Sequence, residues 1–264
     1  MDRKHEGQKF NVVLFEWRYS ETLYKYTLGL HYLTSVLRKA NFNVWDLIFE
    51  KESVGEVLEH ILLLNPDMIG IHFYREKENS IFAFTRKVKA MNPNIKIVLG
   101  GHTATLYGAH ILNTEPAIDI IAFGEGELTM VDLCNRLKNG QSLEGCKGTF
   151  YRKDGVIHRN EDRELIENLD ELPYPALDVL LEKHTTSKCV FAAISTSRGC
   201  MGKCGFCITN RVFDNLSEKG WRGRSPESVV GEVKYLQEAF PGKRLVYRIV
   251  DDPLKTRTPL KKPG

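Results

Sequence analysis

Three cysteines in one short loop form the part of the sequence best suited to chemistry. Cys200, Cys204 and Cys207 have the spacing C-x3-C-x2-C and directly follow the apolar segment Cys189–Thr196, which predicts a strand. Three thiolates this close together need a metal or a cluster, because their charges repel and each thiol must lose its proton. Ordinary four-iron clusters take four cysteines. Three cysteines would therefore leave one iron open to a substrate or cofactor.

A zinc site with a distant fourth ligand is the alternative reading of these cysteines. Neither a histidine nor a further cysteine follows Cys207 at close zinc-finger spacing, which favours the cluster. Glycines inside the loop would let the backbone wrap around such a centre. The other three cysteines are scattered, and we expect ordinary buried thiols there rather than a disulfide framework: Cys134, Cys146 and Cys189.

The segment Cys200-Met-Gly-Lys-Cys-Gly-Phe-Cys207 resembles the signature of the radical S-adenosylmethionine (radical SAM) superfamily. The resemblance implies a [4Fe-4S] cluster on the three cysteines, whose open iron chelates S-adenosyl-L-methionine. Reductive cleavage then yields a 5′-deoxyadenosyl radical. It also implies that Phe206 packs near the adenine and that Asp251 approaches the methionyl amino group. Plain structural roles remain open for both, since an apolar residue can brace a cluster loop and an aspartate at a strand end is a common turn or cap.

A second stretch of similarity is Trp221-Arg-Gly-Arg-Ser-Pro-Glu-Ser, which is common in the radical SAM subfamily with an N-terminal cobalamin-type domain. Ser225 followed by Pro226 predicts a helix start, and the helix should run to Phe240. Arg222 and Arg224 could meet a carboxylate of cofactor or substrate, or could be surface arginines.

The first 140 residues alternate apolar strands with helices, which predicts a doubly wound parallel α/β sheet. Val54, Val57, Leu58, Ile61 and Leu62 form the clearest helical stripe. The expected strands are 10–17, 42–49, 68–74, 95–99 and 119–123, and the expected helices are 27–39, one around the stripe, 80–91 and 128–138.

Glycine clusters follow several of these strands, at the sheet edge where doubly wound folds bind ligands. They resemble the cobalamin-binding domain attached to many radical SAM enzymes, in Val98-Leu-Gly-Gly-His102 and Phe123-Gly-Glu-Gly-Glu127 among other segments. The resemblance implies that a corrin pocket is lined by Gly100, Gly101, His102, Gly124 and Gly126. For any single glycine, simple turn chemistry is the competing explanation.

The loop after the first strand lacks the Asp-x-His-x-x-Gly motif that supplies a histidine ligand to cobalt in some cobalamin domains. It reads Glu16-Trp-Arg-Tyr-Ser-Glu-Thr-Leu-Tyr-Lys-Tyr. We therefore expect cobalamin without a histidine lower ligand, and structural or weakly contacting roles for His31, His72 and His102.

Four segments follow from these patterns. We expect a cobalamin-binding-like domain over 1–145, a hairpin and linker over 146–188 with a turn at Asp154-Gly155, the N-terminal part of a radical SAM partial βα barrel over 189–252, and a basic tail over 253–264. The family's barrel has six βα units and this sequence accounts for two strands and one helix, so we expect a truncated member.

Composition adds limits on location and partners. The net charge of +3 comes largely from the tail, so the body is near neutral and predicts no nucleic-acid surface. No apolar run resembles a signal peptide or a membrane span, which predicts a cytoplasmic protein without a membrane partner. We expect an external electron donor, an unknown small-molecule or peptide substrate, and self-association through an open sheet edge.

The function expected from the resemblance is that of a radical SAM enzyme of the methyltransferase or cyclase type, which generates a 5′-deoxyadenosyl radical, methylates an unactivated carbon, or does both. A truncated, non-catalytic cofactor-binding protein or subunit is the alternative. A phospho-receiver-like module with a zinc knob ranks last, because Glu16 stands alone where an acidic cluster would be needed.

Overall fold

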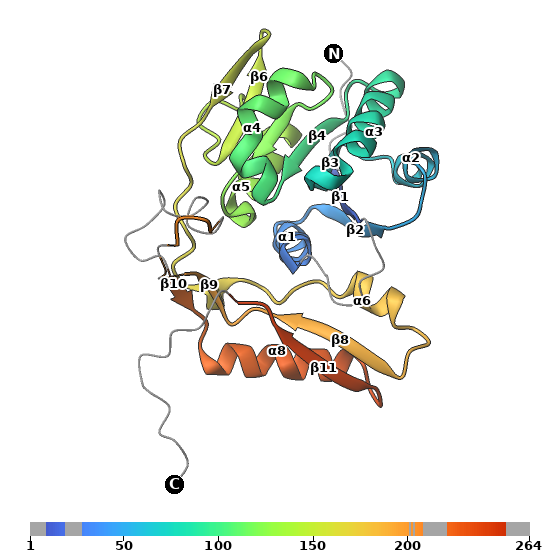
Figure 1. The fold of residues 1–264 in the computed structure, drawn as a ribbon, viewed down its shortest axis with the longest axis vertical. Coiled ribbons are helices and arrows are strands. Elements are labelled where there is room, and N and C mark those ends of the chain that lie inside the picture. The colour runs from blue at the N-terminus through green and yellow to red at the C-terminus, as the bar shows by residue number, and fades with distance from the viewer. Residues whose placement is uncertain (1–8, 19–27, 201, 203, 208–220, 252–264) are drawn as a thin grey trace.

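A computed structural model describes residues 9–18, 28–200, 202, 204–207 and 221–251 of this chain (Figure 1). The predicted basic tail, Asp252 and most of the loop after the first strand lie outside the described residues. The main sheet has the strand order β2-β1-β3-β4-β5-β6-β7. Its parallel strands are β1 (Asn11–Trp17), β2 (Asn43–Phe49), β3 (Met68–His72), β4 (Lys96–Gly100) and β5 (Ile120–Ala122).

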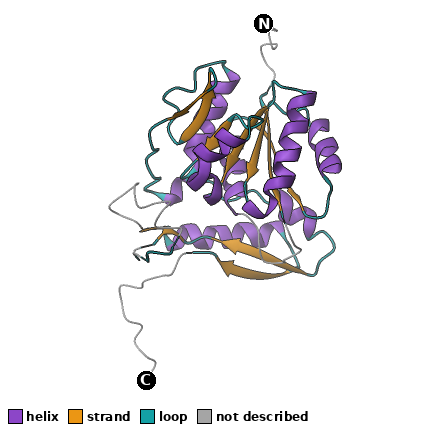
Figure 2. Ribbon diagram, turned by 45° about the horizontal axis from the view of Figure 1, so that its top comes forward, coloured by secondary structure: helices purple, strands orange, loops and turns teal. Residues whose placement is uncertain are grey.

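Helices cover both faces of this sheet, which confirms the doubly wound α/β fold (Figure 2). Val12 and Leu14 of β1 pack with α1 (Leu28–Lys39) and α5 (Gly126–Lys138). The alternate residues of β1, such as Val13 and Phe15, belong to the core on the opposite face. That face is covered by α2 (Val54–Leu63), α3 (Glu78–Met91) and α4 (His102–Thr114), and a short 3-10 turn (Arg75–Lys77) precedes α3.

The predicted hairpin is present but does not stand apart from the sheet. Its strands are β6 (Thr149–Lys153) and β7 (Val156–Arg159), joined at Asp154 and Gly155, which both have positive φ. β6 pairs antiparallel with β5, with Ile121 opposite Phe150. The hairpin therefore extends the first sheet, whereas the sequence grouped it with the linker.

A second unit follows the linker and is built on one βαβ element. β8 (Cys189–Ile194) pairs parallel with β11 (Arg244–Ile249), and α8 (Pro226–Ala239) connects them. Ser225 caps α8 by accepting a hydrogen bond from the Ser228 amide at 3.1 Å, as its sequence predicted. Among the described residues β11 pairs with β8 alone, so self-association through its other edge stays a prediction.

The segment predicted as an extended linker contains a 3-10 turn (Leu169–Glu171) and a short helix, α6 (Asp178–Lys183). Two ion pairs fasten α6 to the first domain. Arg38 donates to both carboxylate oxygens of Asp178, the shorter contact being 2.7 Å, and Lys183 pairs with Glu50. The linker therefore holds the two units together. In the part of the chain that is described, no helix has the length and apolar character needed to cross a bilayer.

A small antiparallel ladder closes the base of the cysteine loop (residues 200–207). β9 (Ser197–Gly199) pairs with β10 (Trp221–Gly223), and Arg198 lies opposite Arg222. The chain leaves this ladder at Gly199 and returns to it at Trp221. The ladder therefore fixes both ends of the segment that carries the three cysteines.

Candidate functional site

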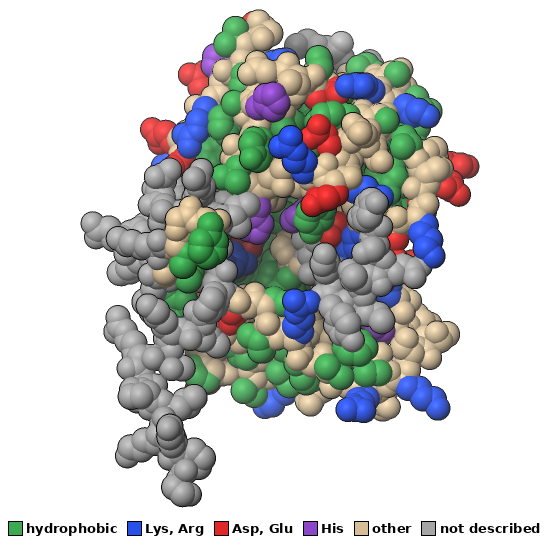
Figure 3. All heavy atoms as spheres, in the orientation of Figure 1, with side chains coloured by type: hydrophobic (Ala, Val, Ile, Leu, Met, Phe, Trp, Pro, Cys, Tyr) green, Lys and Arg blue, Asp and Glu red, His purple; other side chains and the backbone are tan. Residues whose placement is uncertain are grey.

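A cavity of about 180 Å³ opens at the carboxyl edge of the parallel sheet, between the strands and helices α1 and α5. β1 and β3 are neighbours in the sheet although β2 separates them in sequence, so this is the topological switch point where such folds bind ligands. The space-filling view shows the surface hollowed here, with histidine side chains at the rim (Figure 3). We call it the switch-point cavity.

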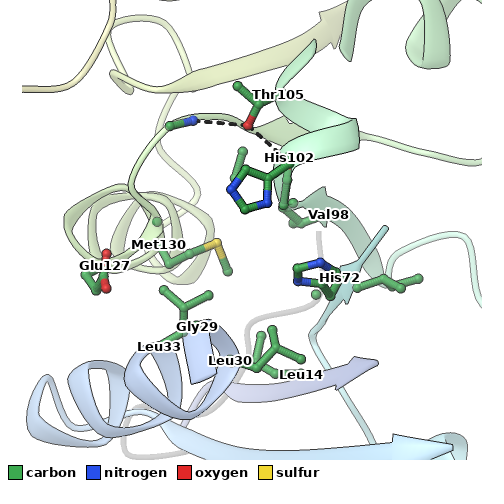
Figure 4. Close-up of a pocket in the computed structure, with 17 residues that line it drawn as sticks. Leu14, Gly29, Leu30, Leu33, His72, Val98, His102, Thr105, Glu127 and Met130 are labelled. Atoms are coloured by element: carbon green, nitrogen blue, oxygen red, sulfur yellow. Dashed lines mark hydrogen bonds between the residues drawn. The ribbon is translucent and has the colours of Figure 1, made fainter. Parts of the chain in front are cut away.

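All five residues predicted to line a corrin pocket line this cavity: Gly100, Gly101, His102, Gly124 and Gly126 (Figure 4). His72, expected from the sequence to be structural or weakly contacting, also lines the cavity. Further wall residues were not predicted as lining residues, because most of them lie inside helices and strands; they include Leu14, Gly29, Leu33, Thr105, Glu127 and Met130. The lining of the cavity as a whole is mostly apolar, so it favours an uncharged group.

Glycine is required at one position of the wall and leaves room for a neighbour at a second. Gly101 has φ +95°, and a Cβ there would lie 2.9 Å from the His72 ring. A Cβ on Gly126 would lie 3.1 Å from Leu33. In contrast, a Cβ on Gly29 would meet nothing within 4 Å, although this helical residue also lines the cavity. A side chain at position 29 would therefore start from the cavity wall with no described atom within 4 Å of its Cβ.

Thr105 ties the two glycine loops together. Its hydroxyl donates to the carbonyl of Gly101 at 3.0 Å and accepts from the amide of Gly124 at 3.3 Å (Figure 4). The loop after β4 and the loop after β5 therefore keep a fixed spacing across the mouth of the cavity.

His72 is the strongly perturbed titratable group of the cavity wall. Its ring lies 4.4 Å from the ring of Tyr74, centroid to centroid. Burial lowers the pKa of His72 to about 4, and the charge of Glu16 opposes this only in part. His72 is thus a neutral imidazole at physiological pH.

This pKa predicts a pH dependence of stability. An unfolded histidine binds its proton below about pH 6.5, whereas native His72 stays neutral down to about pH 4. As the pH falls through this window the unfolded state binds the extra proton, so the free energy of unfolding decreases. His72→Phe should therefore lose less stability than the parent chain between pH 7 and pH 5, measured by urea unfolding at each pH. If the free energy of unfolding fell equally with pH in the two proteins, the lowered pKa of His72 would be contradicted.

The cysteine loop brings two of its sulfurs close to Gly202. The Gly202 amide donates to Cys200 Sγ at 3.3 Å, and a Cβ on Gly202 would lie 3.3 Å from that sulfur and 3.8 Å from Cys204 Sγ. Glycine here lets two sulfurs approach one side of the backbone, as a shared cluster requires. Among the described residues, no three metal-ligating side chains converge as a closed metal site. The three thiols of Cys200, Cys204 and Cys207 are the donor set that such a cluster needs.

Phe206 lies at the surface of this loop and is 93% exposed. The role expected for it, packing near an adenine, stays a prediction. An apolar ring this exposed contributes nothing to the folded core.

Asp251 occupies a turn at the carboxyl end of β11. Its carboxylate accepts from the amides of Thr196 and Ser197, at 2.7 and 3.1 Å, and from the Thr196 hydroxyl. These contacts fasten β11 to the turn between β8 and the cysteine loop. The geometry corresponds to the turn-or-cap role that the sequence left open, and the role expected from the resemblance stays a prediction.

Both candidate carboxylate-binding arginines are occupied by carboxylates of this chain. Arg222 binds Glu125 through two hydrogen bonds of 2.9 and 3.0 Å, and its side chain is 8% exposed. Arg224 pairs with the buried Glu232 and donates to the Ser195 carbonyl at 2.8 Å. Neither arginine is the exposed residue that the sequence also allowed.

Comparison with known proteins identifies the first domain. Residues 22–134 match the family model described as the B12 binding domain. The chain is 31% identical, over 83% of its length, to an uncharacterized methyltransferase of Pyrococcus horikoshii. It is also 31% identical, over 79% of its length, to the anaerobic magnesium-protoporphyrin IX monomethyl ester cyclase of a Synechocystis species. It spans 48% and 42% of these two relatives, about half their length or less.

Solved structures share the fold. The cobalamin-dependent S-adenosylmethionine radical enzyme OxsB, with aqua-cobalamin and S-adenosylmethionine bound, superposes with a TM-score of 0.76 at 21% identity. That match covers 93% of this chain and 34% of OxsB. The radical S-adenosylmethionine methyltransferase TsrM from Kitasatospora setae gives a TM-score of 0.70 at 16% identity, over 91% of this chain and 47% of TsrM. Residues 22–134 are therefore a B12-binding domain, and most of the chain is similar in sequence to a methyltransferase and a cyclase and shares the fold of OxsB and TsrM.

Proposed function

We propose that the chain binds cobalamin at the switch-point cavity and a [4Fe-4S] cluster at Cys200, Cys204 and Cys207, as part of a radical SAM methyltransferase or cyclase. The observation that carries the proposal is the cavity itself. The five glycine-cluster residues chosen from sequence lie around one apolar cavity at the switch point of a B12-binding domain. An electron donor from outside the chain would reduce the cluster.

The size of the cavity fits one part of the cofactor. A pocket that holds a whole drug-sized ligand measures about 300–1,000 Å³, and this one measures about 180 Å³. Leu14, Leu33 and Met130 would contact the part of the cofactor that enters the cavity, and the glycine loops at the mouth would face the corrin ring. Close approach of the ring is possible there because the loops at the mouth carry glycines.

Bound cobalamin would supply a transferable methyl group, and a cluster with one open iron would supply the site for S-adenosyl-L-methionine. The residues of the chain would hold the loops that carry these two cofactors in place. Thr105 fixes the spacing of the two glycine loops. The β9–β10 ladder fixes the two ends of the cysteine loop, and Asp251 fastens the turn behind it.

A single substitution tests the cavity. Gly29→Phe should place a ring in the empty space without displacing any described neighbour. We expect it to weaken hydroxocobalamin binding by at least about tenfold, or about 1.4 kcal/mol, measured by absorbance titration of the anaerobically purified protein. The bound, reduced cofactor of the parent chain should show no cobalt–histidine nitrogen coupling by electron paramagnetic resonance.

The matched control is Gly55→Phe. Gly55 is also a helical glycine, it lies on α2 away from the cavity, and a Cβ there would meet nothing closer than 3.8 Å. It should bind hydroxocobalamin like the parent chain. Equal affinity in the parent and Gly29→Phe proteins would contradict the site. Binding of both cofactors without formation of 5′-deoxyadenosine would favour the non-catalytic alternative.

A further inference from the structure

Arg198 stands between the cysteine loop and the switch-point cavity. It is separated from Cys200 only by Gly199. Its guanidinium donates to Glu127 Oε1 at 2.6 Å and to Glu125 Oε1 at 3.2 Å. Glu127 is itself a wall residue of the cavity. One side chain thus joins the backbone that carries the first cluster cysteine to a carboxylate of the cavity wall.

Arg198 also contacts the second helix of that wall. Its guanidinium carbon lies 5.2 Å from the centroid of the Tyr32 ring, a cation–π distance. Tyr32 belongs to α1, next to the cavity residue Leu33, and Glu127 belongs to the first turn of α5. Arg198 therefore touches both helices between which the cavity opens.

The opposite strand of the ladder binds the same turn. Arg222 lies across from Arg198 in the β9–β10 register and binds Glu125, the residue that begins α5. Glu125 also accepts from the amide of Ile166 at 2.9 Å. Both ends of the cysteine segment are thus anchored on the turn Glu125–Glu127, and we call Arg198, Arg222, Glu125 and Glu127 the arginine–glutamate bridge.

Burial makes the arginine–glutamate bridge stiff. The side chains of Glu125, Glu127 and Arg222 are at most 8% exposed, and that of Arg198 is 19% exposed. Burial alone would raise the pKa of Glu125, but Arg222 and Arg198 outweigh it and lower that pKa. A charge that left such an arrangement unpaired would be strongly disfavoured. Movement of Arg198 must therefore be followed by Glu127, and the reverse.

We propose that Arg198 is a positioning residue that couples the cysteine loop to the cobalamin cavity through Glu127, so that cluster assembly and cobalamin binding strengthen each other. The inference rests on the proposed function. Cluster assembly requires the three thiols to be held together, which restrains the cysteine loop. Because the bridge between the loop and the cavity wall is stiff, a restraint on the loop also restrains Glu127 in the wall. Thermodynamic linkage makes the effect reciprocal.

The test is a comparison of two affinities in the full chain. Hydroxocobalamin is titrated into the iron-free protein and into the protein with its reconstituted cluster, and the ratio of the two dissociation constants is the coupling. In the parent chain we expect the cluster to tighten binding by about fivefold or more. Glu127→Gln should bring the ratio close to one, whatever it does to either affinity alone. Arg198→Lys should also lower it, since an ammonium cannot bind both carboxylates as the guanidinium does.

Glu232→Gln is the matched control. Glu232 is equally buried and pairs with Arg224 on the same unit, but it does not line the cavity. This variant should keep the parent ratio. Three outcomes would overturn the inference and leave the proposed function standing. They are a ratio of one in the parent chain, a parent-like ratio in both bridge variants, and a loss of the ratio in Glu232→Gln equal to that in the bridge variants. A parent chain that binds no cobalamin, or assembles no cluster, would overturn both.

Discussion

Replacing Cys200, Cys204 or Cys207 with alanine should remove most of the iron that the chain takes up on anaerobic reconstitution with iron and sulfide. The parent chain should hold about four irons and turn brown, because a [4Fe-4S] cluster needs every thiolate that the loop can offer. A cluster reduced to two protein ligands should not survive desalting. The measurement is the iron and sulfide content of each desalted variant, together with its brown colour.

Cys189→Ala is the matched control for this series. Cys189 is partly exposed at the start of β8, so its loss removes a thiol without opening a hole in the core, whereas Cys134 and Cys146 are buried. It should keep the parent iron content. Equal iron loss in all four variants would mean that iron binds nonspecifically to thiols, and retention of iron by the three loop variants would place the cluster elsewhere.

Glu125→Ala should destabilise the contact between the two units more than any single surface change. Glu125 is the carboxylate that two arginines share, and both its oxygens are occupied. Its removal leaves the guanidinium of Arg222 buried without its partner. Breaking a buried ion pair from one side costs about 3–5 kcal/mol, and urea unfolding should show a decrease of that order in the free energy of unfolding.

Glu144→Ala gives the comparison for an exposed ion pair. Glu144 lies 3.9 Å from Lys153, and both side chains are more than half exposed. Solvent screens such a pair, so the variant should have the same free energy of unfolding as the parent chain. If the two variants lost equal stability, the arginine–glutamate bridge would contribute no more than a surface contact.

The parallel strands and the helices with clear stripes were predictable because burial imposes their periodicity. The stripe through Val57 and Ile61 became α2, with both residues fully buried. α4 was missed, although it carries Thr105. Its sequence His102–Thr114 has a weak apolar stripe, and Gly101 offers no side-chain cap. α6 was missed because it is short and follows two prolines closely.

The candidate site also has a part that the sequence predicts and a part that it does not. The glycines of the cavity and the cysteines of the loop could be predicted from their local spacing. A close backbone approach to a cofactor and the binding of a cluster both require particular residue types close together in sequence. The arginine–glutamate bridge does not. Glu125 and Arg222 are 97 residues apart, and each looks like an ordinary charged residue beside a glycine. Only the packing of the two units shows that they are partners.

The β9–β10 ladder has a consequence for the entropy of iron binding. Because Gly199 and Trp221 are paired, the two ends of the cysteine segment are held together by the backbone of the chain itself. Closing a flexible segment costs conformational entropy that grows with the logarithm of its length. Here the ladder and the ion pairs to Glu125 already hold the two ends together, so a cluster would not have to supply the free energy for bringing them together.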